Sequence, residues 1–218
     1  MIQKSKILSA QLQVQPYPHA LIENFINPED FRLLLENFPQ EGFLLSKRKS
    51  GSDKTYTVDN NIIFGLELQQ KNPLILNYPY WCALVDELTS KDYKQLISNF
   101  LGVNLQDLPI ELTLKRYKKS HYISPHTDRD YVNATHLIFF NEVWNKNWGG
   151  ELCIMSSSRK IEKKILPLWE KSLLFLRTDN SWHAVTKCNA PVPRIVLQVA
   201  FWRTNKRCLP KGRTDIPY

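Results

Sequence analysis

The chain has 218 residues, of which 43% are hydrophobic and 23% are charged. A chain of this composition buries an ordinary core, which excludes a disordered chain, a collagen-like repeat and a small disulfide-framed protein. The sequence has no apolar run of the roughly 18 residues that a membrane span needs, and its first residues lack the apolar stretch of a secretory signal. We therefore expect a soluble, cytoplasmic protein with no membrane partner, organised as one domain over residues 1–218.

The net charge is +8, from 29 basic and 21 acidic residues. Such an excess favours anionic partners through long-range attraction. Part of it lies in a basic tail, residues 204–218, which has two interpretations. The tail could serve a nucleic-acid-binding module, or it could be a solvated terminus, which is the more common fate of a charge run. The four cysteines are scattered, which indicates free thiols.

Residues 1–109 are expected to form helical support and one N-terminal strand. A short apolar segment at residues 18–24 predicts the strand. Asn27 offers a helix cap and is followed by a proline and two acids, after which apolar residues recur at helical spacing. This pattern predicts a helix over residues 28–37. A second helical stretch covers residues 80–101, with an internal break at a serine and a glycine directly after its end.

A polar segment, residues 43–60, separates the two helical stretches and contains glycine and serine. Its composition predicts a mobile loop, which we expect to order over a bound substrate. Lys47, Arg48 and Lys49 would then help an anionic substrate to approach. A solvated loop without a role is the alternative.

From residue 110 the pattern changes to short segments rich in β-branched and aromatic residues, separated by turns. Several short strands that follow the helices indicate a mainly β protein with N-terminal helices (α+β), whose core over residues 110–203 is a sandwich or jelly-roll flanked by helices. The predicted strands cover residues 110–118, 134–140, 151–155, 172–177 and 194–202.

Two histidines and one aspartate form a candidate metal site. Residues i and i+2 of a strand point to the same face, so His126 and Asp128 can aim at one point. His183 begins another apparent strand and supplies a third ligand. Two imidazoles and one carboxylate with open positions suit non-haem Fe(II) chemistry. The His-x-Asp spacing alone is weak, because a hydrogen-bonded pair at a strand end would show the same pattern.

The motifs around these residues run in a fixed order through the chain: Lys115-Arg116-Tyr117 before His126-Thr127-Asp128, then Thr135-His136-Leu137-Ile138-Phe139-Phe140-Asn141, Trp148-Gly149-Gly150-Glu151-Leu152, Asp179-Asn180-Ser181-Trp182-His183-Ala184-Val185 and Pro193-Arg194-Ile195-Val196-Leu197. In this order and spacing they resemble the Fe(II)- and 2-oxoglutarate-dependent dioxygenase superfamily, in particular its prolyl-4-hydroxylase-like branch. The resemblance covers nearly the whole chain and implies a double-stranded β-helix (jelly-roll) core.

The resemblance also implies a set of cofactors and roles. Fe(II) would be held by His126, Asp128 and His183, and the co-substrate 2-oxoglutarate would chelate it and consume O2, with ascorbate as a supporting reductant. The far carboxylate of 2-oxoglutarate would meet Arg194, because a buried guanidinium needs an anionic partner and its planar fork fits a carboxylate. Tyr117 could add a hydroxyl to the same carboxylate, or it could be a core tyrosine.

Three more residues are candidates to contact the substrate or to lie beside the metal ligands: His136, Phe139 and Trp182. His136 could equally be a hydrogen-bonded core histidine, and Phe139 stands where a tyrosine is frequent in the family. His19 and His121 are expected to lie outside the site.

By resemblance, the chain is expected to be an oxygenase that hydroxylates an unactivated C–H bond and releases succinate and CO2. The carboxylate of Asp128 argues against a halogenating relative, and Val196 departs from the pattern of nucleic-acid demethylases, which argues against a nucleic-acid partner. An amino acid, a peptidyl residue such as proline and a small natural product all stay open as substrates. A non-catalytic jelly-roll that binds a metal or ligand is the alternative function.

Overall fold

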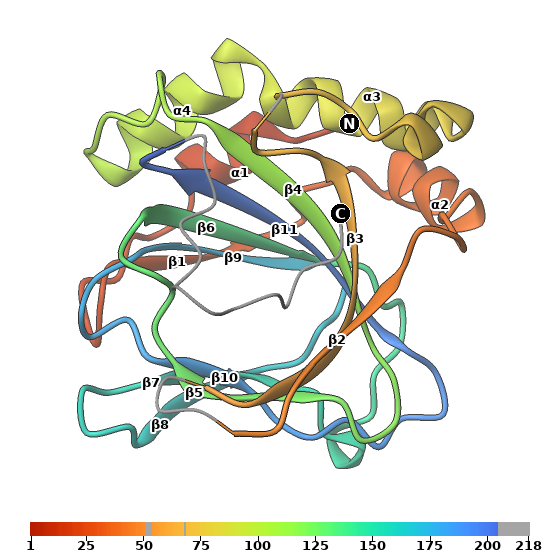
Figure 1. Ribbon diagram of the computed structural model, residues 1–218. Coiled ribbons are helices and arrows are strands. Elements are labelled where there is room, and N and C mark those ends of the chain that lie inside the picture. Colours follow the sequence, from red (N-terminus) through yellow and green to blue (C-terminus); the bar gives the residue numbers. More distant parts are fainter. Residues whose placement is uncertain (51–53, 68, 205–218) are drawn as a thin grey trace.

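The computed structural model describes residues 1–50, 54–67 and 69–204 (Figure 1). The predicted basic tail lies outside these ranges, apart from residue 204. Within them, no helix is both long and apolar enough to cross a membrane. The helices are α1 (Lys4–Leu8), α2 (Pro28–Glu36), α3 (Pro79–Thr89) and α4 (Lys91–Leu101), with short 3-10 turns η1 (Pro73–Asn77) and η2 (Lys146–Trp148).

The strands form one curled sheet with the order β1-β9-β6-β11-β4-β3-β5-β10-β7-β8, and β2 pairs with β3 outside this path. Every strand-to-strand ladder is antiparallel. The strands are β1 (His19–Glu23), β2 (Leu44–Arg48), β3 (Tyr56–Phe64), β4 (Ile110–Tyr117), β5 (Tyr122–His126), β6 (Val132–Phe139), β7 (Leu152–Met155), β8 (Ile161–Ile165), β9 (Lys171–Leu176), β10 (His183–Val185) and β11 (Arg194–Trp202).

The curl of this sheet produces two facing walls (Figure 1). We call β1, β9, β6, β11 and β4 the major wall, and β5, β10, β7 and β8 the minor wall; β3 joins them at one side. The helices cover the outer face of the major wall. This arrangement confirms the predicted α+β class with a double-stranded β-helix core.

The two faces of the major wall bury different sets of side chains, because successive residues of a strand point to opposite faces. In β6, Ile138 packs toward the helices in a cluster that includes Trp81 of α3 and Leu174 of β9. Leu137 and Phe139 point the other way, into a second cluster between the walls. The space between the walls is therefore lined from both sides, and it is where the candidate site lies.

The predicted helix boundaries agree with the structure. The Asn27 side chain accepts a hydrogen bond from the backbone N–H of Asp30 (2.9 Å) and so caps α2. The Ser90 hydroxyl accepts from the N–H of Tyr93 (3.1 Å), which separates α3 from α4. Gly102 ends α4 with φ of 68°, a left-handed conformation that favours glycine.

The prediction of a mobile loop over residues 43–60 is wrong for most of that segment. β2 and the first half of β3 form a hairpin paired in register from Leu44 opposite Asn60 to Arg48 opposite Tyr56. The alternation of side-chain type in Tyr56-Thr57-Val58 is typical of a strand. The basic residues near it favoured the interpretation as a loop. Residues 51–53 lie outside the described residues.

The sequence patterns do not predict α1, β5 or β8. β5 contains Pro125, a residue that strand patterns usually exclude. β8 is an edge strand with mostly exposed polar side chains, so it lacks an apolar pattern.

Candidate metal centre

The minor wall positions the two candidate histidine ligands. His126 ends β5 and His183 begins β10, and the two residues are register partners in the β5–β10 ladder. Their ring centroids are 4.2 Å apart. The Nδ1–H of His126 donates to the carbonyl of Ser124 (2.9 Å), and that of His183 donates to the carbonyl of Ser181 (3.0 Å). Both rings are thereby fixed in the tautomer whose Nε2 lone pair is available to a metal.

Asp128 completes the group. The sequence predicts it on the same strand as His126, but it lies two residues beyond the end of β5. Its Oδ1 is 4.0 Å from the Nε2 of His126 and 3.8 Å from that of His183. Its Oδ2 accepts a hydrogen bond from the hydroxyl of Thr135 on β6 (2.8 Å), which holds the carboxylate in place. One ligand atom of each residue lies within 4.8 Å of the other two, a spacing that a single metal ion can bridge.

The electrostatics of the group favour its metal-binding protonation state. Burial, assisted by the nearby ammonium of Lys54, sets the pKa of His126 well below its ordinary value, and burial also lowers the pKa of His183. Burial alone would raise the pKa of Asp128, but His183, Lys54 and the hydrogen bond from Thr135 together lower it. At neutral pH the imidazoles are neutral and the carboxylate is ionised, so a metal ion need not displace protons.

Arg194 lies on the same inner side, at the start of β11 and opposite Tyr117 of β4. Its side chain is 1% exposed, and its Nε and Nη1 have no hydrogen-bond partner among the described residues. The guanidinium carbon lies 4.8 Å from the ring centre of Tyr117 and 5.4 Å from that of Phe139. A buried cation with unpaired donors needs an anion, and the planar fork of a guanidinium matches a carboxylate. The pocket therefore fits the distal carboxylate of 2-oxoglutarate.

Gly150 makes room for this arginine. Its φ is 71°, and a Cβ atom there would lie 2.9 Å from the ring of Trp144 and 3.4 Å from Cδ of Arg194. A side chain at this position would therefore crowd the guanidinium stem, which gives the Gly149-Gly150 turn of the sequence motif a physical role at the site.

Tyr117 and Phe139 also lie between the walls, with Tyr117 2% exposed and Phe139 fully buried. Burial raises the pKa of Tyr117 to about 12, so its hydroxyl stays protonated and can donate a hydrogen bond. Phe139 offers Arg194 only an aromatic face. The replacement of the frequent tyrosine therefore leaves the guanidinium with fewer polar neighbours.

The structure does not place His136 or Trp182 at the site. His136 lies on the helix-facing side of β6, where its ring nitrogens make hydrogen bonds with the hydroxyls of Tyr93 (2.8 Å) and Ser172 (2.9 Å). His136 is therefore a hydrogen-bonded core histidine, the alternative interpretation of this residue. Trp182 packs on the outer side of the minor wall, with the guanidinium of Arg159 over its ring at 4.1 Å. Adjacent residues of an extended segment face opposite ways, so the orientation that points His183 inward points Trp182 outward.

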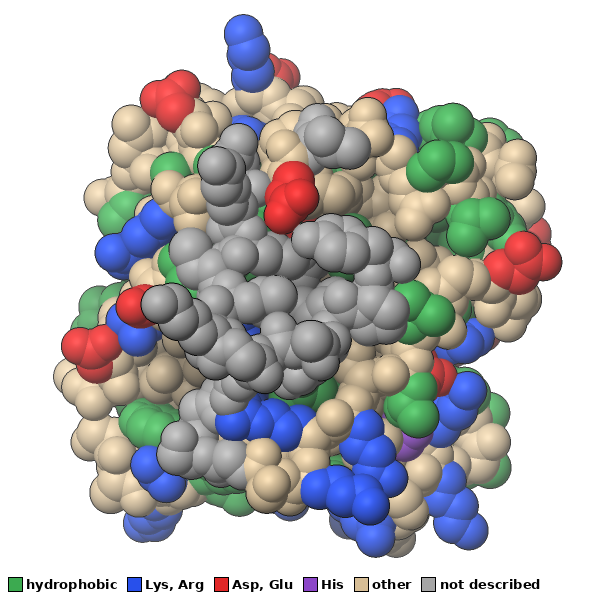
Figure 2. Space-filling model, viewed as in Figure 1, with side chains coloured by type: hydrophobic (Ala, Val, Ile, Leu, Met, Phe, Trp, Pro, Cys, Tyr) green, Lys and Arg blue, Asp and Glu red, His purple; other side chains and the backbone are tan. Residues whose placement is uncertain are grey.

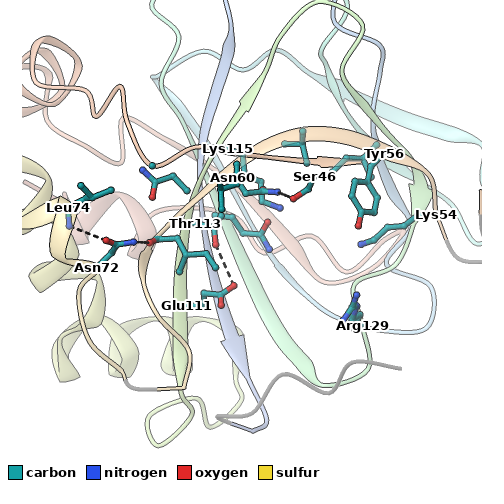
Figure 3. Close-up of a pocket in the computed structure, with 17 residues that line it drawn as sticks. Ser46, Lys54, Tyr56, Asn60, Asn72, Leu74, Glu111, Thr113, Lys115 and Arg129 are labelled. Carbon is teal, nitrogen blue, oxygen red and sulfur yellow. Dashed lines mark hydrogen bonds between the residues drawn. The ribbon is translucent and has the colours of Figure 1, made fainter. Parts of the chain in front are cut away.

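A cavity of about 380 Å³ is lined by Ile123 of β5 and by Arg129, the residue after Asp128, although not by the triad itself, and sequence reasoning missed its basic residues. The labelled side chains run from Leu74 and Asn72 at one end to Lys54 and Arg129 at the other (Figure 3). Lys115 also lines the cavity, and the parity of β4 could have located it, because it precedes Tyr117 by two residues and shares its face.

Tyr17 is a second residue that sequence reasoning missed. Its hydroxyl is buried and has no hydrogen-bond partner among the described residues, and its ring packs in the cluster between the walls. No sequence pattern around this residue indicated that position.

The sequence profile of the 2OG-Fe(II) oxygenase superfamily matches residues 112–202, which contain the triad and Arg194. The chain is 21% identical over 182 residues to prolyl 3-hydroxylase OGFOD1 of Mus musculus, covering 81% of this chain. It spans about a third of the length of this curated relative, 31%.

Two solved structures share the fold. A prolyl-4-hydroxylase of Pseudomonas putida has a TM-score of 0.61 at 19% identity, over 85% of this chain and 92% of the other. A prolyl hydroxylase of Trichoplax adhaerens, in complex with a peptide fragment of a hypoxia-inducible factor degradation domain, has a TM-score of 0.65 at 18% identity, over 92% and 89%. The ordered motifs, the curled sheet and the profile match agree in assigning residues 112–202 to the 2OG-Fe(II) oxygenase superfamily.

Proposed function

We propose that this protein is an Fe(II)- and 2-oxoglutarate-dependent hydroxylase whose substrate is a peptidyl residue, with proline as the first candidate. The observation that carries the proposal is Arg194, a buried guanidinium with unpaired donors on the same inner surface as three metal-ligand atoms within 4.8 Å of one another. A site that only bound a metal would not require this second, anion-seeking group.

Each residue has a defined role in this proposal. His126, Asp128 and His183 hold the metal and leave its remaining positions open, and Thr135 keeps the carboxylate oriented. Arg194 binds the distal carboxylate of 2-oxoglutarate. With O2, the loaded centre supplies the oxidation that places one oxygen atom in a substrate C–H bond, while 2-oxoglutarate becomes succinate and CO2. The protein orients both substrates and excludes water from the space between the walls.

A peptidyl substrate is supported by two independent observations. Residues of β2 and β3 line the cavity, and its lining includes Leu44 and Leu74, which are 44% and 38% exposed, so a ligand longer than one amino acid can extend along it toward the surface. The relatives named above include prolyl hydroxylases, one of them in complex with a peptide. The cavity and these relatives together favour a peptide over a free amino acid or a natural product.

The test is a peptide screen with Fe(II), 2-oxoglutarate and ascorbate, read by succinate release and by mass spectrometry of the peptides. The proposal expects at least one proline-containing peptide to gain one oxygen atom in proportion to succinate formed, and none to do so in Asp128→Ala. Binding of metal and 2-oxoglutarate with no turnover of any peptide, amino acid or small molecule would favour the non-catalytic binder.

A further inference from the structure

We infer that the cavity contains a second anion site, centred on Lys115, which recognises an acidic side chain of the peptide beside the residue to be hydroxylated. This inference rests on the proposed function and narrows its substrate to an acidic peptide. The anion site is separate from Arg194, which is assigned to 2-oxoglutarate.

The position of Lys115 in the sheet is the first argument. Lys115 points into the space between the walls, opposite Asn60 of β3 and Val196 of β11. Arg194 is its diagonal neighbour across the β4–β11 ladder, and such pairs lie about 7–8 Å apart. One carboxylate of 2-oxoglutarate at Arg194 therefore leaves room for a different anion at Lys115.

The second argument is that Lys115 lacks a partner. Its ammonium makes no hydrogen bond or ion pair with any of the described residues, although the side chain is only partly exposed. Burial, followed by repulsion from Lys54, lowers the pKa of Lys115 to about 8, and Arg194 adds to that repulsion. Asp128 and Glu111 attract the ammonium but do not restore its ordinary pKa. An anion bound between the walls would supply the missing interaction.

The third argument is the charge of the whole cavity. Lys54, Lys115 and Arg129 line it together with Glu111 as the acidic residue (Figure 3). Divalent iron and the 2-oxoglutarate dianion cancel each other, so loading the centre does not remove the positive excess. Lys and Arg side chains also gather on the lower part of the face in Figure 2, where Figure 1 draws β2 and β5. Such a field raises the local concentration of acidic ligands.

The lining of the cavity favours a peptide carboxylate over a small free anion. Asn60 and Gln198 line it near Lys115, and Thr113, which precedes Lys115 by two residues on β4, lies opposite Gln198. Amide and hydroxyl groups of this kind both donate and accept hydrogen bonds, as a peptide backbone requires. Lys115 would then bind the acidic side chain of the peptide, while the peptide backbone follows the cavity toward Leu74.

The experiment uses the full chain loaded with Mn(II) and N-oxalylglycine, an inert analogue of 2-oxoglutarate, so that binding is measured without turnover. The probes are fluorescein-labelled peptides with one central proline and a glutamate at each of three positions on either side, each paired with the same peptide carrying glutamine. Fluorescence anisotropy gives the affinities. We expect one glutamate position to bind about tenfold more tightly than its glutamine pair, because a charge-assisted hydrogen bond replaces a neutral one.

In Lys115→Met this preference should fall to near equality, and in Lys115→Glu it should reverse. Lys115→Arg should keep it, which guards against an effect of misfolding. Lys91→Met is the matched control, because Lys91 is an exposed lysine of α4 that does not line the cavity. It should leave the preference unchanged.

Four results would overturn the inference. Equal binding of every glutamate and glutamine pair, or a preference that survives Lys115→Met, would show that Lys115 does not read the peptide. A loss of 2-oxoglutarate affinity in Lys115→Met with an unchanged peptide preference would assign Lys115 to the co-substrate. Failure of the wild-type protein to bind 2-oxoglutarate at all would instead overturn the proposed function, and this inference with it.

Discussion

The two faces of the major wall both bury polar side chains, but they differ in how those side chains are satisfied. On the helix side, His136 is fully buried and both of its ring nitrogens have hydroxyl partners. On the inner side, Arg194 is just as buried, and two of its donors have no partner among the described residues. On the facing minor wall, the Nε2 atoms of His126 and His183 lie 4.0 and 3.8 Å from Oδ1 of Asp128. A satisfied buried group stabilises the fold, whereas an unsatisfied one is a cost that a ligand can remove.

The largest effect is expected from the triad. His126→Ala, Asp128→Ala or His183→Ala should each weaken metal binding by more than the roughly 10–100-fold typical of an altered group that only supports a ligand. Each variant should also abolish turnover of 2-oxoglutarate. Isothermal titration with Mn(II) measures the first effect and succinate release the second.

These three variants should remain folded, because the ligands lie between the walls and not in the helix-side core. Circular dichroism provides this control. Near-normal turnover in any two of them would show that the metal lies elsewhere.

Arg194 is expected to have the next largest effect. Arg194→Met should weaken 2-oxoglutarate binding by roughly a hundredfold or more, because breaking a buried charged pair costs about 3–5 kcal/mol. Metal affinity should be little altered. Arg194→Lys should rescue only partly, since an ammonium lacks the two-pronged geometry.

Arg194→Met also tests the difference between the two faces by its effect on the stability of the protein. Without ligand, Arg194→Met removes a desolvated, unpaired cation, so the melting temperature of the ligand-free protein should not fall. A large drop would mean that Arg194 stabilises the fold as His136 does, and the distinction between the faces would fail.

Thr135→Val tests the support of Asp128. The substitution keeps the side-chain shape and removes the hydroxyl that donates to Oδ2 of Asp128 at 2.8 Å. Metal affinity should weaken by about tenfold, the lower end of the effect of such supporting groups. Thr89→Val, which removes a hydroxyl from α3 on the helix side of the major wall, is the control. Identical metal affinities in both variants would mean that the carboxylate is oriented without Thr135.

His136→Leu should have the smallest effect on the site and a clear effect on stability. It leaves the buried hydroxyls of Tyr93 and Ser172 without their partner, at about 1–3 kcal/mol each. Metal and 2-oxoglutarate affinities should stay as in the wild type. A loss of either affinity in folded protein would connect the helix side to the site.

The pH dependence of stability gives His136 a second signature. Burial lowers the pKa of His136 from 6.5 to about 3, so between these values the unfolded chain binds a proton that the folded protein does not. The free energy of unfolding therefore falls as pH falls below 6.5, by up to about 1.4 kcal/mol per pH unit for one group. Urea unfolding of metal-loaded protein at pH 7 and pH 5.5 should show this slope reduced in His136→Leu.

The sequence predicted well what depends on local signals. The capping patterns at Asn27 and Ser90 located α2 and the boundary between α3 and α4, and the strand patterns located β4, β6, β7, β9 and β11 to within two residues. The ligand atoms of His126, Asp128 and His183 do lie within 4.8 Å of one another, and the pairing of β11 with β4 places Arg194 on the inner side of the major wall.

What the sequence missed depends on which face a residue occupies and on long-range pairing. His136 and Phe139 differ by three positions in one strand and therefore point to opposite sides of the sheet. The hairpin of β2 and β3 looked like a loop because its pairing with β4 and β5 is not visible in composition. Lys54, which precedes β3, and Lys115 of β4 reach one cavity, and only the folded sheet brings them together.

The central claim is that 2-oxoglutarate chelates a metal held by the triad while Arg194 binds its far end. The most direct measurement is an anaerobic titration of the Fe(II)-loaded protein with 2-oxoglutarate, read by the visible absorbance of the metal chelate. The account predicts a saturable band in the wild type, the same band at much higher 2-oxoglutarate in Arg194→Met, and no band in His183→Ala. A wild-type protein that shows no band, or a His183→Ala variant that keeps it, would contradict the account.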